Sequence, residues 1–373
     1  MQNEDKELMK ILDEFNYVGI SLLHATKDKI DYLVTSGYQD LENKTLITDD
    51  TIFRIASISK VVIAIALMQL VEQNKINIYD DISNYLGFKL RNPNYPNDII
   101  TIEQVMTQTS SISDSGSNDL GYDGVNGPTM FVDLEKLLTD SKYQYYTNLT
   151  FLNKHPGEYW NYSNFGCGIL ACIIEKVSGM MYNDYIRQNI LLPLEIDGSY
   201  RVCDIIHQDD IASLYEFYDN KFNKIRDQKI FNEIMFPIYP LGNNFRGPAG
   251  GLFISVKDLA KIMQMMMNKG IYNGVRILKE ETVNEMEKVH WQGLSYDPNY
   301  RAKGLQLNLL DYASKKTLKG HTGGAYGLRS FMFYNDNDGY ILMCNGADYK
   351  QVEDHMTRLQ EKLLTYLVNK FED

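Results

Sequence analysis

A serine and a lysine, Ser57 and Lys60, lie three residues apart at the start of a long apolar stretch of the sequence. A serine hydroxyl is a weak nucleophile near neutral pH and needs a base beside it. Residues three positions apart share one face of a helix, so Lys60 would reach Ser57. A lysine whose surroundings exclude water gives up its proton more easily and can then accept one. The pair therefore indicates covalent catalysis, with Ser57 as nucleophile and Lys60 as general base.

The same stretch allows a purely structural interpretation. Ser57 would then be only the N-cap of a helix, and Lys60 a first-turn residue whose ammonium group reaches water. Ser59 and Ser163 also lie inside candidate motifs, but the sequence gives neither a role, and we treat them as spacers. The choice between the two interpretations depends on partners elsewhere in the chain.

Two further short motifs offer such partners. Tyr162-Ser163-Asn164 precedes an apolar helical run, and His321-Thr322-Gly323-Gly324 lies at the edge of a predicted strand. Taken alone, the first is typical of a surface turn with Asn164 capping the next helix, and the second of a tight strand entry. Placed beside Ser57, the Tyr162 hydroxyl would carry a proton to a leaving group. Asn164 would then hydrogen-bond a substrate amide or hold Lys60 in place.

The chain order S-x-x-K, Y-x-N, then K/H-T-G resembles the serine β-lactamase and penicillin-binding family. Tyrosine at the start of the second motif is similar to the class C β-lactamase and D-alanyl-D-alanine peptidase branch, which has esterase relatives. Four longer stretches also resemble that branch, so that the resemblance covers nearly the whole chain: GYQDLENKTLITDDTIFRIASISK, ITIEQVMTQTSS, IIEKVSG and GPAGGLFISVKDLAKI.

The resemblance implies a metal-free serine hydrolase that needs no cofactor. It implies a β-lactamase/transpeptidase-like fold and an oxyanion hole made by the backbone N–H groups of Ser57 and Gly324. Together with the chemistry above, it predicts the following site: Ser57, Lys60 and Tyr162 as catalytic residues, and Asn164, His321, Thr322 and Gly323 as substrate-binding residues.

Two departures from the family pattern limit what the resemblance implies. His321 stands where many relatives carry lysine, and a histidine near its reference pKa of about 6.5 is mostly neutral at neutral pH. We therefore expect Tyr162 to act as a neutral relay and Lys60 as the principal base, with weaker recognition of a substrate carboxylate. Gln108 and Ser111 replace the usual His and Gly of a T-H-T-S-G loop, which leaves the shape of that loop open.

Two functions remain in view at this point. The first is a hydrolase that forms an acyl-enzyme at Ser57 and cleaves a small amide or ester: a D-amino-acid peptide, a β-lactam or a carboxylic ester. The second is a non-catalytic sensor with the same fold that binds a peptide or penicillin. Retention of a base beside a nucleophile favours the first, because a pure binder has no use for that pair.

Charge and composition narrow the partners. The 373 residues carry a net charge of −12, which opposes binding to nucleic acid or to an anionic membrane, so we expect a small-molecule or short-peptide substrate. The four cysteines form no C-x-x-C pair and the six histidines no H-E-x-x-H pattern, which predicts buried reduced thiols and no metal site. The first residues are acidic and lack an apolar segment, which predicts a cytoplasmic protein unless a signal peptide has been removed. The sequence says nothing of the oligomeric state.

The elements that must position these residues follow from the hydrophobic pattern. The run from Ile55 to Met68 predicts a helix buried on all sides, and it is too short to span a bilayer. Alternating residues near both chain ends predict two antiparallel hairpins, flanked by helices over about 4–15 and 350–371. We expect a single α/β domain of the α+β type, with an antiparallel sheet flanked by helices. Its sheet lobe would comprise residues 1–80 and 245–373, and a mostly helical lobe would be inserted at 81–244.

Overall fold

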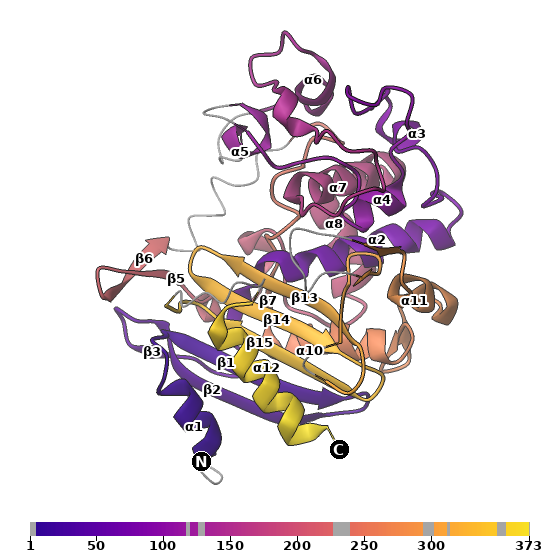
Figure 1. Cartoon of the computed structure of the whole chain (residues 1–373). Coiled ribbons are helices and arrows are strands. Elements are labelled where there is room, and N and C mark those ends of the chain that lie inside the picture. Colours follow the sequence, from indigo (N-terminus) through magenta and orange to yellow (C-terminus); the bar gives the residue numbers. More distant parts are fainter. Residues whose placement is uncertain are drawn as a thin grey trace.

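The structure is a computed structural model that describes residues 5–116, 120–125, 131–226, 239–293, 302–311, 314–348 and 356–372 (Figure 1). Its centre is an antiparallel sheet in the order β10-β11-β12-β13-β14-β15-β1-β2-β3. Strand β1 from the N-terminal region pairs with β15 from the C-terminal region, so both parts of the chain build one sheet. The predicted fold class is confirmed. The strands span Gly19–Thr26 (β1), Ile30–Asp40 (β2), Thr45–Leu46 (β3), Trp291–Gln292 (β10), Ala302–Lys303 (β11), Asn308–Leu310 (β12), Leu318–Ala325 (β13), Leu328–Tyr334 (β14) and Asp338–Cys344 (β15).

Helices cover both faces of this sheet. Helix α12 (Arg358–Phe371) lies on one face with α1 (Lys6–Leu12) beside it, and α10 (Val256–Met267) lies on the other. Alternating side chains of β14 separate the two layers: Phe331 and Phe333 join the core under α12, whereas Met332 joins the core that contains α10. Helix α12 begins at Arg358, where Thr357 caps it, and the predicted start of the terminal helix near residue 350 lies outside the described residues.

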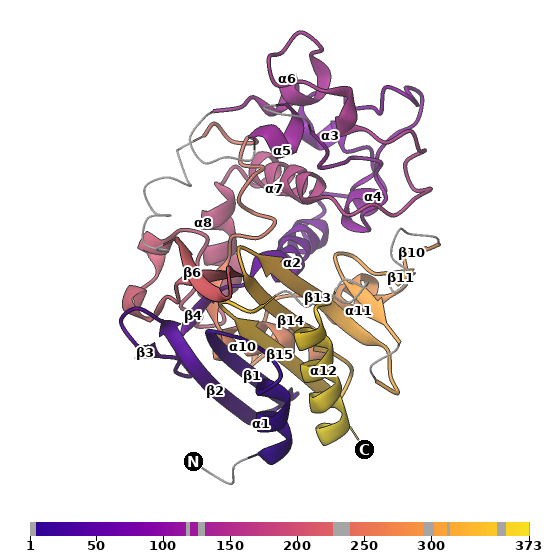
Figure 2. The ribbon, with the colours of Figure 1, turned by 60° about the vertical axis from the view of Figure 1, so that its left-hand side comes forward.

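Helix α2 (Ser59–Glu72) confirms the expectation of a helix buried on all sides. Every residue from Ser59 to Met68 is buried, because the helix lies between the sheet and the group of helices α3 to α7 (Figure 2). Its apolar residues point in every direction, so no side of it can face water. The start of α2 therefore lies where the sheet and these helices meet.

The segment between the two parts of the sheet is mostly helical, but the prediction missed a hairpin there. Strands β5 (Leu214–Tyr218) and β6 (Lys221–Arg226) pair across Asp219 and Asn220, both left-handed with φ of 53° and 56°. An Asp-Asn pair between alternating residues is a hairpin signal, which the loop-rich composition obscured. The lobe boundaries stay a prediction. The helices here are α3 (Ser83–Leu86), α4 (Ile102–Met106), α5 (Gly121–Val125), α6 (Leu134–Thr139), α7 (Asn164–Ser178) and α8 (Tyr182–Ile186).

Short elements complete the frame. Strand β4 (Ile52–Arg54) pairs with β7 (Phe253–Ser255) just before α2, and β8 (Ile271–Tyr272) pairs with β9 (Val275–Arg276). Helix α11 (Glu280–Glu287) follows β9. Within the described ranges, no single helix is long and apolar enough to cross a bilayer; α7 and residues Tyr182–Leu191 pass that test only together, at an angle of 77°.

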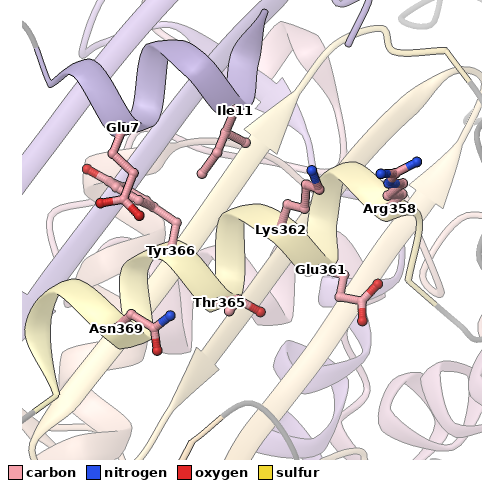
Figure 3. A pocket seen from close by; sticks show the side chains of 8 residues that line it. All are labelled: Glu7, Ile11, Arg358, Glu361, Lys362, Thr365, Tyr366 and Asn369. Carbon is pink, nitrogen blue, oxygen red and sulfur yellow. The ribbon is translucent and has the colours of Figure 1, made fainter. Parts of the chain in front are cut away.

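A groove of about 400 Å³ lies between α1 and α12 (Figure 3). Its side chains are mostly charged or polar and come from these two helices. Because α12 covers the face of the sheet opposite α10, the groove is separated by the sheet from the start of α2. The side chains lining it are Glu7, Ile11, Arg358, Glu361, Lys362, Thr365, Tyr366 and Asn369.

Candidate active site

Ser57 lies in a single 3₁₀ turn, Ala56–Ile58, that leads from β4 into α2. Ala56 has a left-handed backbone with φ of 47°, a conformation that non-glycine residues adopt at a local energetic cost. Ser59 stabilises the turn: its Oγ donates to the Ala56 carbonyl at 2.7 Å and accepts from the Leu252 N–H at 3.3 Å. Our treatment of Ser59 as a spacer was therefore wrong, because it fixes the strained turn that carries Ser57.

Lys60 is fully buried, with 0% of its surface exposed. Its Nζ lies 2.9 Å from Ser57 Oγ, 2.8 Å from Asn164 Oδ1 and 2.9 Å from the Ala249 carbonyl oxygen. These contacts exclude the structural interpretation, because the ammonium does not reach water and Ile58 occupies the N-cap position of α2. The predicted proximity of Lys60 to Ser57 is present.

Tyr162 completes a chain of three polar groups. Its hydroxyl lies 2.5 Å from Ser57 Oγ, and its ring centroid lies 4.8 Å from Lys60 Nζ. The ring packs against the paired indoles of Trp160 and Trp291, which fix its position. The structure thus joins three side chains separated by up to 105 residues, and the geometry allows a proton to move among Ser57, Lys60 and Tyr162.

Asn164 begins α7 and is held by a residue that the sequence analysis missed. Asp114 accepts four hydrogen bonds: from Asn164 Nδ2 at 2.8 Å, Asn164 N at 2.9 Å, Phe165 N at 2.8 Å and Ser163 Oγ at 2.9 Å. Ser163 is the N-cap of α7, so its treatment as a spacer was also wrong. The signal for Asp114 was weak, because it sits in the polar stretch SDSGSND about 50 residues before its partners.

The loop with Gln108 and Ser111 has a defined shape. Both residues have a left-handed backbone conformation, with φ of 66° and 65°. Glycine adopts this conformation most readily, and the family pattern has glycine only at the second of these two positions. Gln108 Oε1 accepts from the Ser163 N–H at 2.8 Å, and the Gln108 carbonyl accepts from Asn161 N at 2.8 Å. Gln108 therefore binds the residues before and after Tyr162 in the chain, Asn161 and Ser163, and holds them against this loop.

His321 lies on β13 and is buried, with its ring centroid 6.2 Å from that of Tyr162. Its Nδ1 lies 2.6 Å from the Thr322 carbonyl oxygen. A carbonyl oxygen only accepts, so Nδ1 carries the hydrogen of this bond. Thr322 pairs with Phe331 on β14 and, by strand alternation, points to the opposite face from His321.

Glycine at position 323 lets β13 approach the Ser57 turn. A Cβ added to Gly323 would lie 2.4 Å from the Ile55 carbonyl oxygen and 2.2 Å from Ser330 Oγ. Only glycine fits this contact, which brings the backbone of the following Gly324 alongside the Ala56–Ile58 turn. An oxyanion hole formed by Ser57 N–H and Gly324 N–H stays a prediction.

The cysteines depart from expectation at one position. Cys167, Cys172 and Cys344 are buried free thiols, but Cys203 is exposed. Burial raises the pKa of Cys167, which lies beneath the site and accepts from the side-chain amides of Gln108 and Gln306 at 3.3 and 3.4 Å. Among the residues that the structure describes, no three His, Cys, Asp or Glu side chains gather as metal ligands.

An antiparallel sheet, with a serine and a buried lysine at the start of the buried helix α2 and a tyrosine brought against them from the segment before α7, is the arrangement of the β-lactamase and transpeptidase class of fold. The Beta-lactamase family model matches residues 6–365, and the chain belongs to this family. The resemblance drawn from the three motifs is thereby confirmed.

The chain matches only part of the length of each of the following curated relatives. Protein flp of Staphylococcus aureus strain N315 is 30% identical over 196 residues, 52% of this chain and 37% of that protein. Penicillin-binding protein 4* of Bacillus subtilis strain 168 is 29% identical over 195 residues, 52% of this chain and 40% of that protein. The matched region spans less than half the length of these relatives.

Solved structures share the fold over nearly the whole chain. EstCE1, described as a hydrolase with promiscuous acyltransferase activity, has a TM-score of 0.74 at 19% identity and covers 97% of both chains. The D-amino acid amidase of Ochrobactrum anthropi SV3 has a TM-score of 0.69 at 21% identity and covers 98% of both. The octameric penicillin-binding protein homologue of Pyrococcus abyssi has a TM-score of 0.71 at 23% identity, over 92% of this chain and 72% of that one.

Proposed function

We propose that this chain is a serine hydrolase that forms an acyl-enzyme at Ser57 and cleaves a small amide or ester. The observation that carries this proposal is the short contact of Ser57 Oγ with two proton carriers, Lys60 Nζ at 2.9 Å and Tyr162 OH at 2.5 Å. A serine that served only to cap a helix would have no need of a buried lysine and a tyrosine on its hydroxyl.

The proposed reaction begins with proton removal. Lys60 Nζ takes the proton of Ser57 as Oγ forms a bond to the carbonyl carbon of the substrate, and the carbonyl π electrons move to its oxygen. The N–H groups of Ser57 and Gly324 would hold that oxyanion. When the bond to the leaving group breaks, the leaving atom takes the Tyr162 proton, and Lys60 returns its proton to Tyr162. Water then cleaves the acyl-serine ester by the reverse use of the same groups.

The substrate class follows from His321 and from the neighbours. His321 donates from Nδ1 to a backbone carbonyl and does not supply the fixed cation of a lysine, which favours substrates without a strict requirement for a carboxylate. The structural neighbours include a hydrolase with promiscuous acyltransferase activity and a D-amino acid amidase. D-amino-acid amides or peptides and carboxylic esters are therefore our preferred substrates over classical penicillins.

The experiment is turnover of a p-nitrophenyl ester and a penicillin by the full chain, followed together with the intact protein mass. We expect continuous release of p-nitrophenol that Ser57→Ala abolishes. Stoichiometric acylation of Ser57 without further release would show that the chain is a sensor and not a hydrolase. Unchanged turnover in Ser57→Ala would remove Ser57 from the reaction altogether.

A further inference from the structure

We propose that Asp114 is a positioning residue that aims the lone pair of Lys60 at the Ser57 hydroxyl. The inference rests on the proposed function and deepens it, because it concerns how the general base is oriented. Asp114 touches neither Ser57 nor Lys60 in any contact described above; it acts through the side chain of Asn164.

The first step is the orientation of the Asn164 amide. An amide has an accepting oxygen and a donating nitrogen, which can be exchanged by a half turn about the last side-chain bond. An ionised carboxylate only accepts, so the contact of 2.8 Å with Asp114 Oδ2 requires the Nδ2 group of Asn164 on that side. The Oδ1 atom must then face Lys60, as observed at 2.8 Å. Asp114 thereby fixes which atom Lys60 meets.

The carboxylate is itself held firmly. The backbone N–H groups of Asn164 and Phe165 and the hydroxyl of Ser163 each donate to it, at 2.8 to 2.9 Å. These donors belong to the first turn of α7, where unpaired N–H groups favour a negative charge. Asp114 therefore cannot turn away without leaving several donors unpaired.

The second step is the orientation of Lys60. A neutral amine has two N–H donors and one lone pair. Asn164 Oδ1, once oriented, and the Ala249 carbonyl oxygen can only accept, and they lie 2.8 and 2.9 Å from Nζ. As an ammonium group, Lys60 donates to all three neighbours, and its Nζ lies 2.9 Å from Ser57 Oγ. Once Lys60 has lost one proton, the two carbonyl oxygens keep its two N–H donors, and the lone pair faces Ser57 Oγ. Ser57 then donates its only proton to Lys60, and Tyr162 OH donates to Ser57 Oγ.

Replacement of Asp114 should release this alignment. In Asp114→Asn, the new side chain brings N–H donors of its own, so the Asn164 amide is free to turn its Nδ2 toward Lys60. An N–H of Lys60 would then compete for Ser57, and the lone pair would point elsewhere. A misdirected catalytic group costs about 10²-fold in rate, so we expect the acylation rate constant to fall by about that factor.

The experiment measures the acylation rate constant and the substrate dissociation constant separately, by stopped flow with a p-nitrophenyl ester. We expect Asp114→Asn to lower the rate constant by about 10²-fold and to change the dissociation constant by no more than about threefold. In an Asn164→Ala background, Asp114→Asn should cost no more than about threefold, since its effect passes through the missing amide.

Ser163→Ala is the matched control. It removes one hydrogen bond to Asp114 and the cap of α7, but leaves the Asn164 amide facing the carboxylate. It should lower the melting temperature while keeping the acylation rate constant within about threefold of wild type. Equal losses in Ser163→Ala and Asp114→Asn, or losses that multiply in the Asn164→Ala background, would overturn the inference.

Two further outcomes are decisive. If wild type is not acylated, the proposed function fails and the inference with it; if wild type is acylated and Asp114→Asn matches it, only the inference fails. Should Asp114→Asn not fold, a neutron structure of the wild-type chain decides. We expect deuterium of Asn164 Nδ2 on the Asp114 side, and an ND₂ group directed at Lys60 would overturn the inference.

Discussion

Replacement of Gly323 by alanine tests whether β13 must touch the turn that carries Ser57. The new Cβ would lie 2.2 Å from Ser330 Oγ and 2.4 Å from the Ile55 carbonyl oxygen, whereas real Cβ atoms stay at least 3.0 Å away. The shortfalls are 3.0 − 2.2 = 0.8 Å and 3.0 − 2.4 = 0.6 Å. Ser330 can turn its hydroxyl aside only by giving up its hydrogen bond of 3.1 Å to the Ile55 carbonyl oxygen, and Ile55 presents backbone, so β13 or the turn must move.

The size of this displacement determines how much stability and activity we expect Gly323→Ala to lose. Overpacking of this kind costs about 1–3 kcal/mol of unfolding free energy. A shift approaching 1 Å between the nucleophile and the oxyanion donors costs about 10²-fold in kcat. We therefore expect Gly323→Ala to lose activity well beyond its loss of stability.

The assay pairs the melting temperature with turnover of a p-nitrophenyl ester. Gly250→Ala is the control, because its Cβ would meet the neighbouring Ala56 backbone at an ordinary 3.6 Å; both properties should stay near wild type. Adding Ser330→Ala to Gly323→Ala should restore stability in part, since the Ile55 contact remains. Wild-type activity in Gly323→Ala would refute the close approach of β13 to the Ser57 turn.

Three further predictions concern single side chains. Lys60→Ala should lower turnover by about 10² to 10⁴-fold, and Lys60→Arg should do no better, because guanidinium does not give up its proton. His321→Lys should lower KM for an anionic substrate at about pH 8, where histidine is neutral, and leave KM for a neutral ester unchanged. Burial raises the pKa of Asp5, but hydrogen bonds from Lys370 and Tyr366 outweigh it and lower the pKa from 3.8 to about 2. Asp5 therefore stabilises the fold above about pH 4, and the melting temperatures of wild type and Asp5→Asn should converge as the pH falls from 4 to 2.

Each of these has a contrary result. Near-normal activity in Lys60→Arg would exclude Lys60 as the base. Parallel KM changes for the anionic and neutral substrates in His321→Lys would show that this position does not sense substrate charge. A melting-temperature difference between wild type and Asp5→Asn that persists at about pH 2 would show that the charge of Asp5 is not what stabilises the N-terminal helix.

Local sequence patterns predicted the helices and strands in which apolar residues recur at a regular spacing. The hairpin of β1 and β2, that of β14 and β15, and the buried helix α2 each follow from residues that are neighbours in the sequence. The short hairpin of β5 and β6 escaped because its turn, Asp219 and Asn220, lay in a segment already full of turn residues.

The residues that hold the candidate site in place were harder to predict from the sequence. The spacing of Ser57 and Lys60 indicates their contact, because one helical turn brings them together. Asp114 could not be found this way, since its contacts with Asn164 form only when a loop packs on the start of α7, 50 residues away. Ser163 and Ser59 were likewise missed, because capping and turn fixation depend on backbone geometry that a motif does not encode.

The most direct test of the account is covalent labelling of the nucleophile. The full chain would be treated with a fluorescent phosphonate, its intact mass measured, and the labelled residue mapped by peptide sequencing. We predict one adduct per chain, on Ser57, which is absent in Ser57→Ala and formed much more slowly in Lys60→Ala because the base is missing. No adduct on wild type, or an adduct on a residue other than Ser57, would contradict the assignment of Ser57 as the nucleophile of a serine hydrolase.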